Sequence, residues 1–289
     1  MKRITLTTIF YMLILFNAFA QSGEEGRTTI TANYSLSGLS FSTKHNGSGS
    51  ILTWRDIYLH GGYLNVEFPA APGIFDRSII GAGFSGSFQG YWTDDDANND
   101  MNVIHVSTTE ATLLEIKYEM LANGSMFNPK LGFDFNMLTL KNYDGRPFKR
   151  SSPYWWEDIE GFTCGYDIYK AGFYVGAQAV FRLDNMYLDV CGQIGLGIYS
   201  GIGNWLNNTV YKNPVSFIDS GLSFRGGCDV EAGLKLGRVA FFYRFMLAYE
   251  INHNFGITTQ FLSDGKDAMQ THSFDLLRSS FSAGLKISF

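Results

Sequence analysis

Polar and apolar side chains alternate with a period of two over long stretches of this chain. The clearest stretch is 114–120, where one set of alternate positions is apolar and the other is charged. The same alternation runs through 186–198, 222–236 and 281–289. Successive side chains of a β-strand point to opposite faces, so this period indicates strands with one apolar face and one polar face. The chain is therefore expected to be all-β.

Ten such segments account for the chain, and their connections alternate between short and long. An even number of antiparallel strands, with short turns at one end and long loops at the other, is typical of an outer-membrane barrel. The predicted strands are roughly 29–41, 56–68, 78–92, 111–122, 129–141, 161–183, 186–200, 220–236, 238–251 and 274–289. The long, polar connections are 42–55, 93–110, 142–160, 201–219 and 252–273.

A soluble β-sandwich or lipocalin-like barrel would show the same period with the two faces exchanged. Three features favour the membrane barrel instead. Residues 1–20 have the basic start, the apolar run and the Ala18-Phe19-Ala20 cleavage site of a secretory signal peptide. Several strands are longer than the 5–6 residues usual in globular proteins. The last strand ends on Phe289 and resembles the C-terminal strand that the outer-membrane assembly machinery recognises.

These features together predict the domain organisation and the location. Residues 1–20 are expected to be a signal peptide, and 21–289 a single ten-stranded antiparallel transmembrane β-barrel. The barrel is expected in the bacterial outer membrane, with short periplasmic turns and with long extracellular loops at the cell surface. Its expected partners are the outer-membrane lipids and, through the strand ending in Phe289, the barrel-assembly machinery.

The composition excludes several classes of function. The formal net charge of −5 offers nucleic acid no basic surface. Cys164, Cys191 and Cys228 are too few and too far apart for a disulfide framework, so free thiols in strands are expected. No Cys/His cluster has metal-ligand spacing, and neither a metal nor a cofactor is predicted. The glycine run 81–86 matches a dinucleotide fingerprint in letters only, because no helix follows it.

The minority face of the strands carries acids and bases mixed together. Each would cost about 2–4 kcal/mol if it faced lipid near the midplane, so these residues are expected to line the lumen. The mixture predicts ion pairs that fill a narrow interior, and ten strands give too small a bore for a porin-like channel. The expected lumen residues are Glu115, Lys117, Glu119, Asp134, Asp189, Arg225, Asp229, Glu231, Lys235, Arg244 and Lys286.

The second long connection contains an acidic cluster at 94–100. The simplest interpretation of such a charge run is a solvated loop tip that binds a divalent cation loosely.

Short motifs along almost all of 21–289 follow the order and spacing of one known family. They are Trp54; His105 with Glu115; Gly165-Tyr166; Tyr174 and Gly176; Phe181-Arg182 with Asp184; Tyr199-Ser200-Gly201; Ala232-Gly233; and Ala283-Gly284-Leu285-Lys286. In these motifs the chain resembles the omptins, which are ten-stranded outer-membrane endopeptidases. The resemblance implies an omptin-like, aspartic-type endopeptidase if the catalytic set is complete.

Omptins carry an Asp-x-Asp pair in the second outer loop and a facing Asp-x-His pair in the fourth, which activate a water between them. Asp94 and Asp96 match the first pair by spacing and loop. The second pair is missing, because 201–219 has no His and no Asp before Asp219. Tyr169 also stands where the family has an Arg linked to lipopolysaccharide binding. The resemblance thus implies a degenerate site, with Asp94 and Asp96 as the candidate catalytic residues.

Three functions remain open from the sequence. The first is a surface endopeptidase that uses Asp94 and Asp96 with a base from the fifth loop, His253 or His272. The second is a non-catalytic barrel that acts as an adhesin, a receptor or a structural component and binds an extracellular protein or peptide. The third, a small-solute pore, conflicts with a filled lumen.

Overall fold

The computed structural model describes residues 27–289 apart from 46–49, 71–73, 97–100, 106–107, 125–126, 150–151, 156–158, 206–214, 263–266 and 270–271. For some strand residues beside these gaps it describes the backbone alone. The predicted signal peptide, 1–20, lies outside the described residues. No helix in the described part of the chain is long and apolar enough to cross a membrane.

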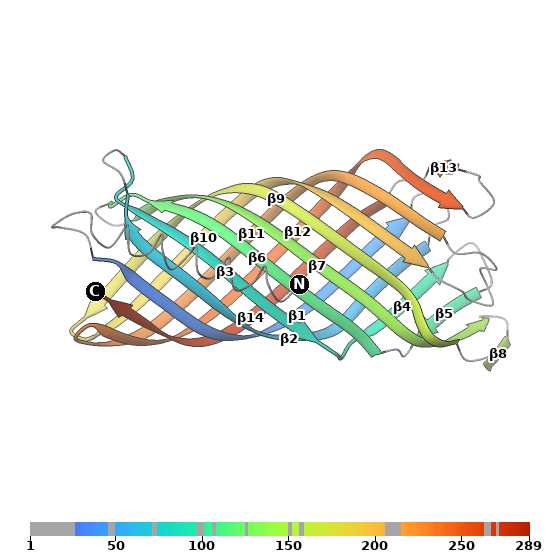
Figure 1. The fold of residues 1–289 in the computed structure, drawn as a ribbon, viewed down its shortest axis with the longest axis horizontal. Helices are drawn as coiled ribbons and strands as arrows, with labels where there is room; N and C mark the ends of the chain where they lie inside the picture. Colours follow the sequence, from blue (N-terminus) through green and yellow to red (C-terminus); the bar gives the residue numbers. More distant parts are fainter. Residues whose placement is uncertain are drawn as a thin grey trace, which may run out of the picture.

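Ten long antiparallel strands form the closed wall of a barrel (Figure 1). β1 pairs with both β2 and β14, which closes the sheet. Two of the ten strands are interrupted. β3 and β4 are the two parts of one of them, and both pair with β2. β5 and β6 are the two parts of the other, and both pair with β7. The strands are β1 (Thr29–His45), β2 (Ser50–Pro69), β3 (Arg77–Ser87), β4 (Tyr91–Asp96), β5 (Met101–His105), β6 (Thr108–Leu121), β7 (Asn128–Lys149), β8 (Ser152–Trp155), β9 (Ile159–Leu183), β10 (Met186–Trp205), β11 (Val215–Leu236), β12 (Val239–Leu262), β13 (Asp267–Met269) and β14 (His272–Ser288).

The predicted ten-stranded antiparallel barrel is confirmed, but its strands run further than the alternation predicts. We call the end with the short connections the turn end and the opposite end the loop end. The alternation predicts an end of β7 near 141, whereas the strand continues to Lys149. Residues 94–96 also belong to β4, paired with β2 and β5, and not to a loop as predicted. Where both faces of a strand meet water, the period of two disappears although the pairing continues.

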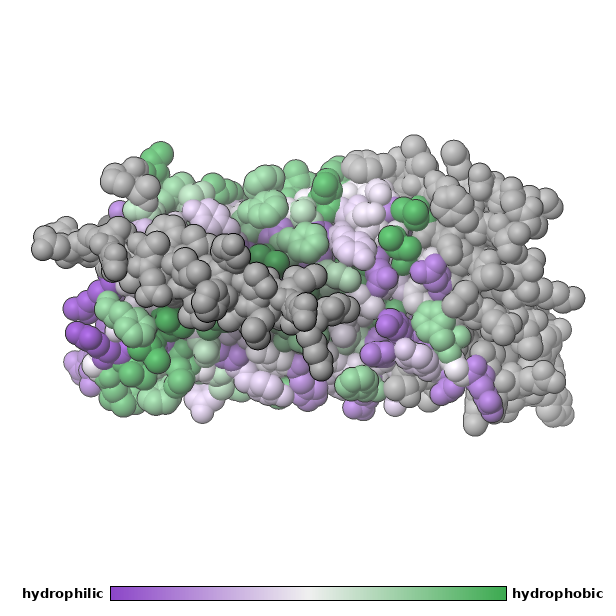
Figure 2. All heavy atoms as spheres, in the orientation of Figure 1, coloured by the Kyte–Doolittle hydropathy of each residue, from purple (hydrophilic) through white to green (hydrophobic). Residues whose placement is uncertain are grey.

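The outside of the wall carries an apolar band. On β11, Phe224 and Leu234 are 50% and 43% exposed, whereas Ser223 and Glu231 on the opposite face are 5% and 0% exposed. The alternation predicted over 222–236 is therefore confirmed, with the apolar side chains outside. Figure 2 shows hydrophobic side chains gathered over the wall towards the turn end of the visible face.

The band gives way to polar side chains on the outer face nearer the loop end. The Tyr143 hydroxyl donates a hydrogen bond of 2.9 Å to Glu110, and this bond raises the pKa of Tyr143 above its usual value. Lys141 pairs with Glu110 in the strand register and is exposed. Because a charged side chain facing lipid is costly, these residues mark where this part of the wall leaves the hydrocarbon.

The inside of the barrel near the loop end is filled by an apolar cluster, which we call the plug. Phe41 lies at its centre, with ring centroids 5.0 Å from Trp54, 5.6 Å from Tyr166 and 5.1 Å from Phe274. These four side chains are at most 2% exposed. The buried members of the plug are Leu39, Phe41, Trp54, Ile57, Leu59, Ala111, Leu113, Leu138, Leu140, Cys164, Tyr166, Ile168, Tyr199 and Phe274.

A β-bulge on β2 lets Trp54 and Ile57 both face the plug. The register with β1 shifts between Leu39, which pairs with Ile57, and Phe41, which pairs with Trp54. Asp56 takes up the extra residue with a left-handed φ of 56°. A bulge places two residues opposite one and so resets which face each side chain meets.

Interior tyrosines lie over glycines of the neighbouring strand. Gly83 pairs with Tyr63 and Gly132 pairs with Tyr174, and a Cβ at either glycine would overlap the tyrosine ring. Gly81 and Gly83 are therefore packing positions against Tyr63 on a strand, in agreement with the rejection of the dinucleotide motif.

Candidate functional site

The two predicted catalytic acids lie on the loop-end extension of the wall. Asp94 pairs with Leu52 on β2 and with Val103 on β5, and Asp96 pairs with Ser50. The side chains of Asp94 and Asp96 lie outside the described part of the structure. The structure therefore places the backbone of the predicted acid pair at the loop-end mouth of the barrel.

Asp219 is the acid that ends the fourth predicted loop, and it lies inside the wall. Its side chain is 1% exposed, and the Tyr166 hydroxyl donates to both carboxylate oxygens, at 3.0 Å and 2.9 Å. Gly201 pairs with Asp219, and a Cβ there would overlap the carboxylate. The ring of Tyr199 packs edge-on against Phe274, with centroids 4.6 Å apart. Two of the segments on which the predicted resemblance rests, Gly165-Tyr166 and Tyr199-Ser200-Gly201, thus meet around an enclosed carboxylate.

The two histidines considered as substitute bases have different positions. His253 is exposed and lies on the same face of β12 as Ile251, which is 46% exposed, whereas Asn252 between them is 0% exposed. The imidazole of His253 therefore points away from the barrel interior. His272 opens β14, where its backbone pairs with His45, and its side chain lies outside the described part.

A buried amide positions the tryptophan of the plug. Trp54 Nε1 donates to Asn142 Oδ1 at 3.2 Å, and Thr109 Oγ1 donates to the same oxygen at 2.9 Å. Asn142 Nδ2 in turn donates to Cys164 Sγ at 3.0 Å. No sequence motif predicts this group, and its one signal is Asn142, a polar residue that follows the inward apolar residues Leu138 and Leu140.

Ion pairs cross the lumen on the turn-end side of the plug. Glu115 and Arg278 form a two-bonded pair at 2.6 Å and 2.8 Å. Lys170 Nζ lies 2.7 Å from Glu250, and Arg225 pairs with Asp134. The predicted lumen positions of Glu115, Asp134 and Arg225 are confirmed, whereas Lys170, Glu250 and Arg278 were missing from the prediction.

Two further clusters lie nearer the turn end. Glu119 accepts hydrogen bonds or ion pairs from Lys117 and Lys130, both at 3.2 Å, and from the Tyr174 hydroxyl at 2.6 Å. Glu231, with its side chain 0% exposed, contacts three donors on three strands. They are Arg244 at 2.6 Å, the Tyr187 hydroxyl at 2.8 Å, and Lys286.

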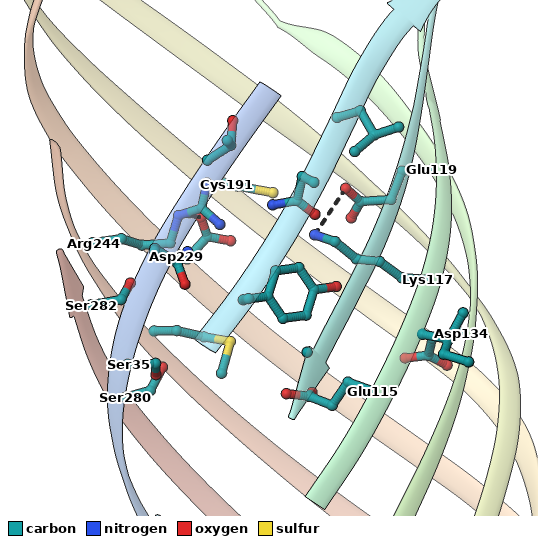
Figure 3. Close-up of a pocket in the computed structure, with 18 of the residues that line it drawn as sticks. Ser35, Glu115, Lys117, Glu119, Asp134, Cys191, Asp229, Arg244, Ser280 and Ser282 are labelled. Carbon is teal, nitrogen blue, oxygen red and sulfur yellow. Dashed lines mark ion pairs between the residues drawn. The ribbon is translucent and has the colours of Figure 1, made fainter. Parts of the chain in front are cut away.

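The lumen is not filled as the sequence predicts. A cavity of ≈ 230 Å³ lies among these ion pairs, lined by acids, bases and serines that Figure 3 shows pointing into it. Lys235, also expected in the lumen, is exposed near the turn end. Within the described residues, no group of His, Cys, Asp and Glu side chains could hold a metal ion.

Comparison with known proteins shows the fold of this barrel. No family model matches the chain, and no curated protein does. The outer membrane protease OmpT from Escherichia coli superposes with a TM-score of 0.68 at 14% identity, over 93% of this chain and 99% of that one. The translocator domain of the autotransporter NalP from Neisseria meningitidis covers 99% and 97%, with a TM-score of 0.40 and 9% identity. The second likeness is too weak to use, and the first shows the fold alone: this chain is a ten-stranded β-barrel of the bacterial outer-membrane class.

Proposed function

We propose that this chain is an omptin-like outer-membrane barrel that has lost peptide hydrolysis and uses its loop end to bind an extracellular protein or peptide. The observation that carries the proposal is the enclosure of Asp219. The segment that holds the acid–histidine pair in omptins offers this single acid, and it is buried against Tyr166.

The loss of the base is the main argument against hydrolysis. A positioned base that takes the proton from water typically contributes 10²–10⁴-fold to the rate. Asp94 and Asp96 supply only the acid half of the omptin set, and residues 201–219 contain no histidine. The carboxylate of Asp219 is 1% exposed and already bonded to a hydroxyl, so it can neither orient an imidazole at the mouth nor reach a water there.

The floor of the loop-end mouth also differs from a hydrolytic cleft. The plug places Phe41, Trp54 and Phe274 across the lumen, each at most 1% exposed. Hydrolysis needs polar groups that hold a water and stabilise an oxyanion. An apolar floor provides neither, whereas the strands that rise above it form a rigid rim on which loops can present a binding surface.

The rim is substantial. β7 continues past the exposed Lys141 to Lys149, which is 149 − 141 = 8 residues. At about 3.3 Å per residue these add roughly 26 Å of paired strand. β12 likewise continues to Leu262 and pairs there with β13. We infer that this end lies at the cell surface and that the turn end faces the periplasm.

A cleavage assay tests the proposal. Refolded barrel should not cleave fluorogenic peptides with paired basic residues at neutral pH, or should do so only at a rate that the double variant Asp94→Asn, Asp96→Asn shares. Robust turnover that this double variant abolishes would contradict the proposal. A further loss on His272→Ala would then identify the base, with His253→Ala as the matched control because His253 lies on the outer face.

A further inference from the structure

The turn-end cavity takes no part in the proposed function, and its walls carry many charged side chains. Six carboxylates and six basic groups line it, which gives 6 − 6 = 0 formal charge. Lys117 and Glu119 lie next to each other on the inner face of β6 and form an ion pair at 3.2 Å in the wall of the cavity (Figure 3). Because the charges balance, the cavity selects neither cations nor anions.

Several buried polar atoms of the wall lack a protein partner. Asn65 Oδ1 and Asp189 Oδ1 belong to side chains that are 7% and 8% exposed, and neither has a hydrogen-bond partner among the described residues. The same holds for Gln178 Oε1 and Arg278 Nε. A buried polar atom without a partner costs about 1–3 kcal/mol, and several such atoms around one space indicate that its contents supply the hydrogen bonds. Acceptors and donors both occur, as water requires.

The size of the cavity limits what it holds. Its ≈ 230 Å³ is enough for several water molecules. Pockets for drug-sized ligands are larger, about 300–1,000 Å³, and mostly apolar. A space of this size and polarity suits water and small hydrophilic molecules.

The two ends of the cavity are unequal. Towards the loop end stands the plug, where Phe41 is 0% exposed and Phe274 is 1% exposed. Towards the turn end, the Glu67 and Arg77 side chains that line the cavity are 27% and 33% exposed, although they form an ion pair at 2.8 Å. Lys286 on β14 is 25% exposed. Solvent therefore reaches the lining from the turn end.

We propose that the turn-end half of the barrel is a hydrated blind chamber, which admits small hydrophilic molecules from the turn end and is sealed from the loop end by the apolar plug. The chamber explains how a barrel with so many interior charges remains stable, because water solvates the groups that the ion pairs leave unpaired. Because the chamber is closed at the loop end, the lumen does not form a pore through the barrel.

The three native cysteines report on three environments of this arrangement. Cys191 is 4% exposed and lines the chamber, Cys164 lies in the plug at 1% exposure, and Cys228 is exposed on the outer face of β11. Full-length barrels that each keep one cysteine, with the other two changed to Ala, are refolded into detergent micelles, where a probe in solution reaches both ends of the barrel. Each is treated with a cationic probe, trimethylammonioethyl methanethiosulfonate, or an anionic one, sulfonatoethyl methanethiosulfonate, and the intact mass is followed with time.

Cys191 should react at least about ten-fold faster than Cys164, since thiol modification requires access to the sulfur. The two probes should modify Cys191 at rates within about three-fold of each other, because the lining is charge-balanced. Urea-unfolded samples show that each thiol can react. A folded barrel in which Cys191 stays unmodified, or in which Cys164 reacts as fast as Cys191, overturns the chamber.

The seal is tested in the barrel that keeps Cys191. Vesicles in which proteolysis shows the loop end to be outside receive the probe from outside only. Cys191 should remain unmodified there and should become reactive in the double variant Phe41→Ala, Phe274→Ala, whose folding is checked by heat-modifiable gel mobility. Equal protection with and without the two rings in a folded barrel would show that the plug is not the seal.

Discussion

Removing Glu231 should strongly destabilise the barrel, because three donors converge on its carboxylate and its side chain is 0% exposed. Arg244 reaches it through Nε at 3.0 Å and Nη2 at 2.6 Å, the Tyr187 hydroxyl at 2.8 Å, and Lys286 completes the set. A hydrogen bond to a charged group contributes about 1.5–3 kcal/mol, but such contacts do not add. Breaking a buried pair typically costs about 3–5 kcal/mol, because the partner charge is left uncompensated. We expect Glu231→Ala to lower the free energy of unfolding by that amount.

The neighbouring acid provides the control. Asp229 reaches Arg244 only at 3.7 Å, and its side chain is 21% exposed, so Asp229→Asn should cost about 1 kcal/mol or less. Both variants are refolded into lipid vesicles, and their urea midpoints are read from the gel mobility of folded and unfolded barrel. Equal midpoint shifts for Glu231→Ala and Asp229→Asn, or a cost below about 1 kcal/mol for Glu231→Ala, would refute the convergence argument.

Three further predictions concern the wall. Leu234→Arg should impair assembly and Lys235→Ala should not, as read from heat-modifiable gel mobility; equal behaviour would overturn the assignment of faces. Gly132→Val should destabilise the barrel by about 1–3 kcal/mol, because its side chain meets a tyrosine ring, whereas Gly192→Ala, with nothing within 4 Å, should be nearly neutral in the same urea titration. Deleting Phe289 should slow insertion in cells without blocking export, and unchanged surface abundance would count against an assembly signal.

Where the wall meets lipid, the sequence was sufficient to predict the fold. Ile116 is 46% exposed outside, and Lys117 on the next position points into the lumen towards Glu119, as the alternation requires. The ends of the strands were not predictable in this way. Beyond Lys141 both faces of β7 are polar or mixed, so the pattern that identifies a strand is lost although its hydrogen-bonded pairing persists.

The candidate site could be predicted only in part, because proximity across a barrel is not encoded by spacing along the chain. Asp94 and Asp96 were assigned from a short motif, and they remain a prediction because the structure describes only their backbone, in β4 at the loop end. The Asp219–Tyr166 contact joins residues 53 apart, and the Glu115–Arg278 contact joins residues 163 apart. Only the strand register brings such residues together, and the register depends on bulges such as the one at Asp56.

The plug corresponds to a second pattern in the sequence, in which the apolar residues of a strand change from one face to the other. On β1 the apolar positions change face within one strand: Leu36 is 45% exposed outside, whereas Leu39 and Phe41 are buried inside. On β6 the change occurs between Ile116, which faces outward, and Leu113, which is buried inside.

Both halves follow the same physical preference, in which apolar side chains occupy whichever face does not meet water. In the turn-end half that face is the lipid side, and the hydrated chamber takes the charges. In the loop-end half the outer face carries Glu110, Lys141 and Tyr143, so the apolar residues turn inward as they do in a soluble barrel. The change of face between Leu36 and Leu39 therefore marks the level at which the barrel leaves the membrane, and the plug is the core of the part above it.

A spin label should show the difference: at position 36 it should be accessible to oxygen dissolved in lipid, and at position 40 to a water-soluble nickel chelate. The same accessibility at both positions would contradict the change of environment.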